Sequence, residues 1–142
     1  MDKLDILKEE NFNKMIEDIN ELDGFANDIG IKILSISKGY AKAEINIYKK
    51  HLNPGNSVHG GCIFTLADSV GGLAAWSRGS YVATVSSNIN YLNPAIECNK
   101  LIGTAREIKY GKKLSVYEVE IYDEKDRLIA KATNTYYNLG KK

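Results

Sequence analysis

The stretch HLNPGNSVHGGCIFTLADSVGGLAAWS, residues 51–77, decides the fold. Its first part, up to residue 61, is dense in turn-forming residues and predicts a loop. Its second part, residues 62–77, is apolar or small on every side and carries a single charged residue, Asp68. A helix without a polar face is buried on all sides. We therefore expect a central helix that the rest of the chain surrounds.

The flanking sequence is expected to form the strands that surround this helix. Six β-rich runs are expected: 31–38, 40–48, 81–92, 100–108, 114–122 and 128–137. Turn formers at 110–112 and 123–126 join the last three runs as hairpins. Long antiparallel strands beside one helix too apolar to face water imply an α+β fold, with the sheet curled around the helix.

The N-terminal region has a different pattern. Residues 2–22 place apolar residues at helical spacing among charged ones, which predicts one amphipathic helix stopped by Gly24. The length, 142 residues, favours a single domain over residues 1–142.

Composition excludes several classes of function. The net charge of +1 gives no overall attraction to nucleic acid or to a membrane. The N-terminus lacks the apolar core of a signal peptide, and the apolar stretch at 62–77 is too short for a confident membrane span. The two cysteines, Cys62 and Cys98, suggest neither a metal site nor a disulfide framework. We expect reduced thiols in the cytoplasm, with Cys62 a buried small residue rather than a nucleophile.

Three short motifs carry a resemblance to a known family. Asn53, His59-Gly60-Gly61 and Leu66-Ala67-Asp68 stand at spacings that resemble the PaaI-like hotdog-fold thioesterases. The run TVSSNINYLNPA, residues 84–95, and the Gly111-Lys112 turn are also similar, and the likeness covers about residues 20–138. It implies a hotdog fold, and hydrolysis of an acyl-CoA to a free acid and CoA. No metal or redox cofactor is expected, because a thioester is already activated for acyl transfer.

Asp68, Gly60 and Gly61 are the strongest candidates for the chemistry. A carboxylate on a helix built for burial is costly unless something uses it, so we expect Asp68 to be a general base or a nucleophile. The alternative is an Asp on a small exposed stripe with Thr65 and Ser69. Backbone N–H groups at the start of a helix have no partner within it and can hold a developing oxyanion. This predicts that Gly60 polarises the thioester carbonyl and that Gly61 contacts the substrate, unless the pair is only a tight turn.

The remaining candidates have two interpretations each. His59 acts as an acid or base or, as we favour, orients the turn, and Asn53 positions substrate or water or simply forms a turn before Pro-Gly. Thr84 and Ser86, two apart, are expected to share one face of a strand. There Thr84 supports the acid and Ser86 contacts substrate, unless both are plain strand hydroxyls. His51 has no motif support and is expected at the surface.

Basic residues gather around one predicted hairpin. Lys112 and Lys113, with Arg106 and Lys109 nearby, would suit the phosphates of CoA. A solvated hairpin tip has the same composition. One departure from the family lies elsewhere, at Asn93, where many relatives carry Arg before the Pro.

Helix geometry predicts that the site spans two chains. Asp68 follows Gly60 by eight residues, which is about 12 Å along a helix, whereas a base must come within about 3 Å of its proton. Two antiparallel helices in a symmetric homodimer would place Asp68 of one chain opposite Gly60 of the other. The resemblance implies the same dimer, assembled further into a homotetramer. Two other functions stay open: a non-catalytic acyl-CoA-binding or sensing protein, and a hotdog dehydratase or hydratase.

Overall fold

The structure is a computed structural model that describes residues 3–141. In chain order its elements are α1 (Lys3–Ile6), α2 (Phe12–Asn20), α3 (Phe25–Asp28), β1 (Ile31–Ser37), β2 (Tyr40–Asn46), η1 (Lys49–His51), α4 (Gly60–Trp76), β3 (Ser80–Tyr91), β4 (Lys100–Tyr110), β5 (Leu114–Asp123) and β6 (Leu128–Lys141). All six predicted strands and the predicted central helix are present. The expected hairpin turns join β4 to β5 and β5 to β6.

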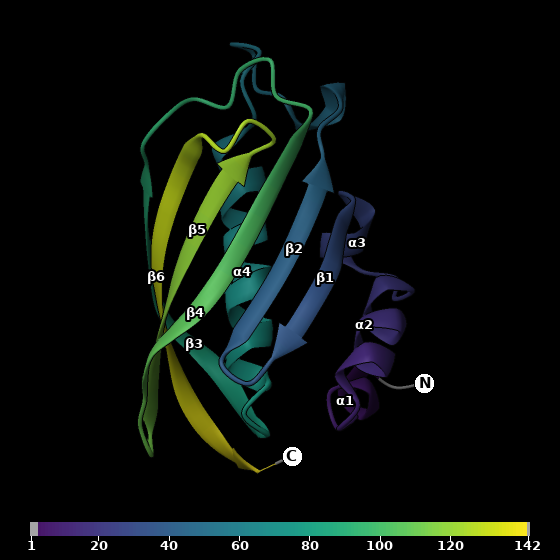
Figure 1. Cartoon of the computed structure of the whole chain (residues 1–142), viewed down its shortest axis with the longest axis vertical. Helices are drawn as coiled ribbons and strands as arrows, with labels where there is room; N and C mark the ends of the chain where they lie inside the picture. Colours follow the sequence, from purple (N-terminus) through teal and green to yellow (C-terminus); the bar gives the residue numbers. More distant parts are fainter. Residues whose placement is uncertain (1–2, 142) are drawn as a thin grey trace.

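The strands form one antiparallel sheet in the order β1-β2-β4-β5-β6-β3. The sheet curls around α4, which runs along its inner face (Figure 1). The chain leaves α4 and enters β3 at the edge of the sheet opposite β1. The helix itself packs across the sheet, against β2, β4 and β5 as well as β3. The predicted α+β arrangement, a sheet wrapped around a central helix, is confirmed.

One face of α4 packs against the sheet through seven buried residues: Ile63, Leu66, Ala67, Val70, Gly71, Ala74 and Ala75. On the opposite face Gly61 and Asp68 are exposed, and Thr65 and Gly72 are half-buried. These four lie at i, i+4, i+7 and i+11, so they form one line on the helix surface, which we call the open stripe. The expectation that α4 is buried on all sides is therefore wrong for a single chain.

The single amphipathic helix expected at 2–22 is also wrong; its first residue lies outside the described part of the chain. The chain is interrupted between α1 and α2, where Asn11 caps α2 by accepting the Lys14 N–H with its side chain (3.2 Å). Gly24 is the N-cap residue of α3 and does not end a long helix. The apolar spacing still identifies buried residues after this break, because Met15 of α2 is buried and α2 packs against the sheet.

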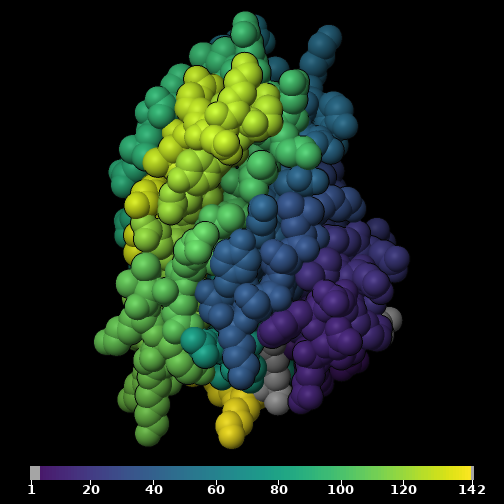
Figure 2. Space-filling model, viewed as in Figure 1, coloured from purple at the N-terminus to yellow at the C-terminus, as the bar shows by residue number. Residues whose placement is uncertain are grey.

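The N-terminal helices cover only one side of the molecule. They lie against β1, while the outer face of β4 and β5 is uncovered (Figure 2). Asn20 fixes this position, since its side chain exchanges two hydrogen bonds with the backbone of Ile33 in β1 (2.8 and 3.0 Å). Within residues 3–141, no helix has the length and hydrophobicity needed to cross a membrane.

Candidate active site

The first turn of α4 is capped by His59. Its Nδ1 accepts the Gly61 N–H (2.8 Å), and its carbonyl accepts the N–H groups of Cys62 (2.9 Å) and Ile63 (3.2 Å). The Gly60 N–H, in contrast, donates to no atom within residues 3–141. Of the two glycines predicted to meet the substrate, only Gly60 therefore offers an N–H to a carbonyl. Gly61 can contact a ligand only with its carbon surface and its carbonyl group.

Tyr91, at the end of β3, covers Gly60. Its hydroxyl donates to the Gly60 carbonyl (3.0 Å), and a Cβ at position 60 would lie 3.4 Å from the tyrosine ring. This bond joins the edge strand to the start of α4. Sequence reasoning gave Tyr91 no role, because nothing in the strand pattern shows that its hydroxyl reaches the helix.

His51 is buried, with 4% of its surface exposed, so its expected position on the surface is wrong. Its Nδ1 accepts the Tyr48 N–H (2.9 Å), its Nε2 donates to the Ile29 carbonyl, and its own carbonyl accepts the His59 N–H (2.8 Å). His51 thus connects α3, η1 and the cap of α4.

The side chain of Asn53 holds its own turn. Its Oδ1 accepts the N–H groups of Gly55 (2.9 Å) and Ser57 (3.2 Å), and its Nδ2 donates to the Ser57 hydroxyl (2.9 Å). One Nδ2 hydrogen is left over. The turn-forming interpretation thus has direct support, and a role toward substrate depends on that single remaining donor.

Asp68 is exposed on the open stripe, yet partial burial raises the pKa of its carboxyl above the usual value. The helix around it is held by Asn134 of β6, whose Nδ2 donates to the Ala67 carbonyl (3.3 Å) and to the Tyr136 hydroxyl (3.1 Å). Burial raises the pKa of Tyr136, and the charge of Asp68 raises it further. Asp68 is therefore a partly desolvated carboxylate on a helix with a fixed position.

Two pockets flank the capped turn. One, of about 340 Å³, is lined by Ser57, Val58, Gly60, Ile63, Tyr91, Asn93, Pro94 and Ala95. The other, of about 470 Å³, is lined by Phe25, Ile29, Lys50, His51, Leu52, His59, Gly61, Cys62 and Thr65. Gly60 lines the first pocket, and its neighbours His59 and Gly61 line the second, so the turn that carries the Gly60 N–H borders both pockets.

Comparison with known proteins shows the family. A model described as the thioesterase superfamily matches residues 55–130, just over half of the chain. The chain belongs to the thioesterase superfamily. The predicted resemblance to PaaI-like hotdog thioesterases and the prediction of a thioester hydrolase are confirmed.

Individual relatives cover most of the chain. A putative esterase of Archaeoglobus fulgidus is 38% identical over 109 residues, 77% of this chain and 71% of the relative. The acyl-coenzyme A thioesterase PaaI of Escherichia coli is 30% identical over 120 residues, 84% of this chain and 86% of the relative. The solved structure of that PaaI protein has a TM-score of 0.82 at 29% identity, covering 88% of this chain and 91% of its own. A Streptococcus mutans protein solved with acetyl-CoA has a TM-score of 0.78 at 32% identity, covering 86% and 96%.

In this thioesterase, Thr84 and Ser86 do not share a face. The strand register changes between them, so that Thr84 lies opposite Tyr136 and Ser86 opposite Thr135. Because Tyr136 and Thr135 are adjacent residues of β6, their side chains point to opposite faces of the sheet. Thr84 is on the inner face with α4, and Ser86 is on the outer face. The bulge, which the sequence does not signal, makes the expected shared face wrong.

The basic cluster lies far from Gly60 of the same chain. Lys112 and Lys113 are exposed in the β4–β5 hairpin, at the end of the sheet where α4 finishes, whereas Gly60 begins α4 at the other end (Figure 1). The guanidinium of Arg106 lies over the ring of Tyr40, 5.5 Å from the ring centroid. These lysines can serve a site at Gly60 only across a chain boundary. Asn93, at the departure from the family pattern, donates to the Leu128 carbonyl (2.8 Å).

Neither cysteine has the surroundings of a nucleophile. Burial raises the pKa of the Cys62 thiol, and it raises that of Cys98 to about 11. Both thiols are free. Within residues 3–141, no group of three or more His, Cys, Asp or Glu side chains is arranged to hold a metal ion.

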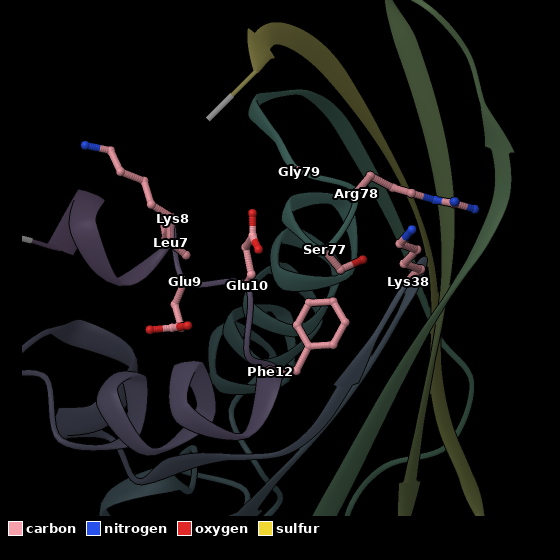
Figure 3. Close-up of a pocket in the computed structure, with 9 residues that line it drawn as sticks. All are labelled: Leu7, Lys8, Glu9, Glu10, Phe12, Lys38, Ser77, Arg78 and Gly79. Carbon is pink, nitrogen blue, oxygen red and sulfur yellow. The ribbon is translucent and has the colours of Figure 1, made fainter.

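A further pocket, of about 510 Å³, lies at the end of α4 remote from Gly60. Residues before α2 line one side, and residues around Ser77–Gly79 and Lys38 line the other (Figure 3). Its lining contains two acidic side chains, Glu9 and Glu10, and three basic ones, Lys8, Lys38 and Arg78. Arg78 is already paired with Glu107 (2.7 Å). This pocket therefore has no single charge preference and is separate from the candidate site.

Proposed function

We propose that this thioesterase hydrolyses acyl-CoA substrates whose acyl group is aryl or of medium chain length. The observation that carries the proposal is the capped first turn of α4, where the Gly60 N–H alone is left for a carbonyl oxygen. Relatives named as acyl-CoA thioesterases, and structures solved with acetyl-CoA or coenzyme A, support CoA as the thiol half of the substrate.

The proposed reaction assigns one step to each group. The Gly60 N–H and the helix dipole polarise the thioester carbonyl. Asp68 of a second chain takes a proton from water, whose oxygen attacks the carbonyl carbon, and negative charge collects on the oxygen beside Gly60. The C–S bond then breaks, and CoA leaves as a thiol with the proton returned by Asp68. Direct attack by the Asp68 carboxylate, with hydrolysis of the resulting anhydride, gives the same products.

The other candidate residues support these steps. His59 keeps the turn capped, and Asn53 holds the preceding loop while its remaining Nδ2 hydrogen meets the substrate or the water. Thr84, on the inner face of β3, supports Asp68. Lys112 and Lys113 of the second chain meet the CoA phosphates.

A symmetric dimer would assemble the site. If Gly60 of one α4 lies opposite Asp68 of the other, two antiparallel helices cross near residue 64, on the side of the open stripe. β3 is an edge strand of 12 residues, and its Val85 is 58% exposed. Long exposed edges favour pairing with another strand, so we place β3 of the second copy there. The further assembly into a tetramer remains a prediction.

The test is release of free thiol from a panel of acyl-CoAs by the purified protein. We expect turnover of phenylacetyl- and medium-chain substrates, retained in the presence of a chelator. Asp68→Asn, which keeps the shape of the side chain and removes the base, should lower kcat by about a hundredfold or more. Tight acyl-CoA binding without any turnover would instead show a non-catalytic binding protein. Activity lost with chelator and restored by a divalent ion would overturn the metal-free mechanism.

A further inference from the structure

The pocket of about 470 Å³ between α3 and the first two turns of α4 is lined by His59 and Gly61, the two chain neighbours of Gly60. Among the described residues of the capped turn, the Gly60 N–H alone has no hydrogen-bond partner. Gly61 and Thr65 of the open stripe form one wall, and Phe25, Ile29 and Leu52 form the opposite side. A carbonyl held by the Gly60 N–H would therefore have its acyl carbons within reach of this space. The pocket lies well within the size range of small-molecule sites.

Most polar groups in the wall already have partners. The exceptions among the described residues are Nε2 of His59 and the Lys50 ammonium, whose single hydrogen bond goes to the Asp28 carbonyl (3.4 Å). The Thr65 hydroxyl donates to the Gly61 carbonyl (2.8 Å), both ring nitrogens of His51 are hydrogen-bonded, and Nδ1 of His59 accepts the Gly61 N–H. Because burial raises the pKa of the Cys62 thiol, this side chain is neutral in the wall. A polar occupant would lose its water and gain few hydrogen bonds, which is unfavourable, so the wall suits an apolar group.

We propose that this pocket is the acyl-binding subsite, and that Cys62 and Phe25 set the length of the neutral, apolar acyl group that the enzyme accepts. Cys62 borders the space one residue beyond Gly61, and Phe25, 71% exposed, borders it from α3. A cavity of about 150 Å³ holds a benzene ring, so the space exceeds what an acetyl group needs. This inference rests on the proposed function and adds the residues that select the substrate.

The kinetic test compares kcat/KM for acetyl-, hexanoyl-, decanoyl-, phenylacetyl- and succinyl-CoA. Cys62→Leu narrows the pocket, so we expect kcat/KM for decanoyl-CoA to fall at least about tenfold while that for acetyl-CoA changes little. Phe25→Ala should shift the preference toward longer chains. Cys98→Ala changes the other half-buried thiol, away from the pocket, and should leave the ratios unchanged. Equal losses on every substrate, or a preference for succinyl-CoA, would overturn the subsite.

A second measurement needs neither turnover nor a folded Cys62→Leu variant. In an Asp68→Asn/Cys98→Ala protein, the rate at which N-ethylmaleimide alkylates Cys62 is measured with decanoyl-CoA or with CoA alone. The subsite predicts that decanoyl-CoA slows alkylation at least fivefold more than CoA does; equal rates contradict it. If the wild-type protein hydrolyses no acyl-CoA, the proposed function fails while protection still reports on the pocket. If hydrolysis occurs, but the Cys62 and Phe25 variants keep the wild-type dependence of kcat/KM on acyl chain length and decanoyl-CoA gives no protection, only the subsite proposal fails.

Discussion

Two neighbouring glycines of α4 should respond in opposite ways to the same substitution. A methyl group at Gly71 would lie 2.6 Å from the Tyr136 hydroxyl and closer still to Nδ2 of Asn134. One at Gly72 would meet no atom within 4 Å among residues 3–141, apart from its chain neighbours and the adjacent helix backbone. Gly71→Ala therefore forces Asn134 or the helix to move, with loss of the hydrogen bonds to the Ala67 carbonyl and the Tyr136 hydroxyl.

The expected loss follows from these contacts. Overpacking costs about 1–3 kcal/mol, disrupted buried hydrogen bonds cost about 1–3 kcal/mol, and alanine returns about 1 kcal/mol of helix propensity. We expect Gly71→Ala to lower the free energy of unfolding by about 2–4 kcal/mol, a fall in Tm of roughly 6–15 °C. Gly72→Ala should be neutral or slightly stabilising.

The assay is thermal unfolding at one fixed protein concentration, since association also shifts Tm. Asn134→Ala in the Gly71→Ala background removes the clashing amide and should recover at least about 1 kcal/mol, measured as a double-mutant coupling. Because Asp68 lies one turn from Gly71, kcat should fall with Gly71→Ala and recover in the double variant. Equal Tm values for the two glycine variants, or a coupling of zero, would refute the packing described for α4.

Three further outcomes are expected. Lys112→Ala should raise KM more than it lowers kcat if the lysine holds a CoA phosphate before and during the reaction; steady-state kinetics with an unchanged KM would assign the cluster to solvent. Asp68→Asn should raise Tm near neutral pH. Burial raises the pKa of the Asp68 carboxyl, so the folded protein is stabilised by the protonated form and loses this stability as pH rises through the folded-state pKa. The gain in Tm should vanish below the ordinary Asp value of 3.8, and a gain independent of pH would contradict the assignment. Asn53→Asp keeps the acceptor for the Gly55 and Ser57 N–H groups but loses the Nδ2 donor, so it should be as inactive as Asn53→Ala if that donor meets the substrate; near wild-type turnover of Asn53→Asp would make Asn53 a turn former only.

The fold was accessible from the sequence where a pattern is local and unambiguous. Residues 62–77 are apolar on all sides, and the turn formers at 110–112 and 123–126 fix two hairpins. The N-terminal helix was less accessible, since the apolar spacing of residues 2–22 continues across the break that Asn11 caps. The spacing of apolar residues predicts which residues are buried, but it does not predict whether they belong to one unbroken helix.

The sequence predicts most of the residues of the candidate site, but it does not predict the contacts between them. The motif located His59, Gly60 and Asp68, but it did not show that His59 occupies the Gly61 N–H or that Tyr91 covers Gly60. These bonds depend on side-chain direction and on strand ends meeting in space. The bulge that turns Thr84 and Ser86 to opposite faces likewise depends on register with β6, which no local sequence signal gives.

The central claim is that the Gly60 N–H of one chain and Asp68 of another act on one substrate, and mixed dimers test it directly. Gly60→Pro deletes the N–H at the first helical position, where proline is tolerated, and His59 already has the extended conformation that precedes proline (φ −58°, ψ 133°). Gly60→Ala, which keeps the N–H, is the matched control and should retain activity. Gly60→Pro and Asp68→Asn homodimers should both be nearly inactive.

Thiol release is then measured on verified heterodimers of Gly60→Pro with Asp68→Asn chains. In a shared site, one of the two sites combines the intact Gly60 of one chain with the intact Asp68 of the other, and the second site carries both lesions. We expect recovery of up to about half of the wild-type activity per dimer, as two-fold symmetry requires. If both groups act within one chain, every site keeps one lesion, and heterodimers no more active than the parent homodimers would contradict the shared site.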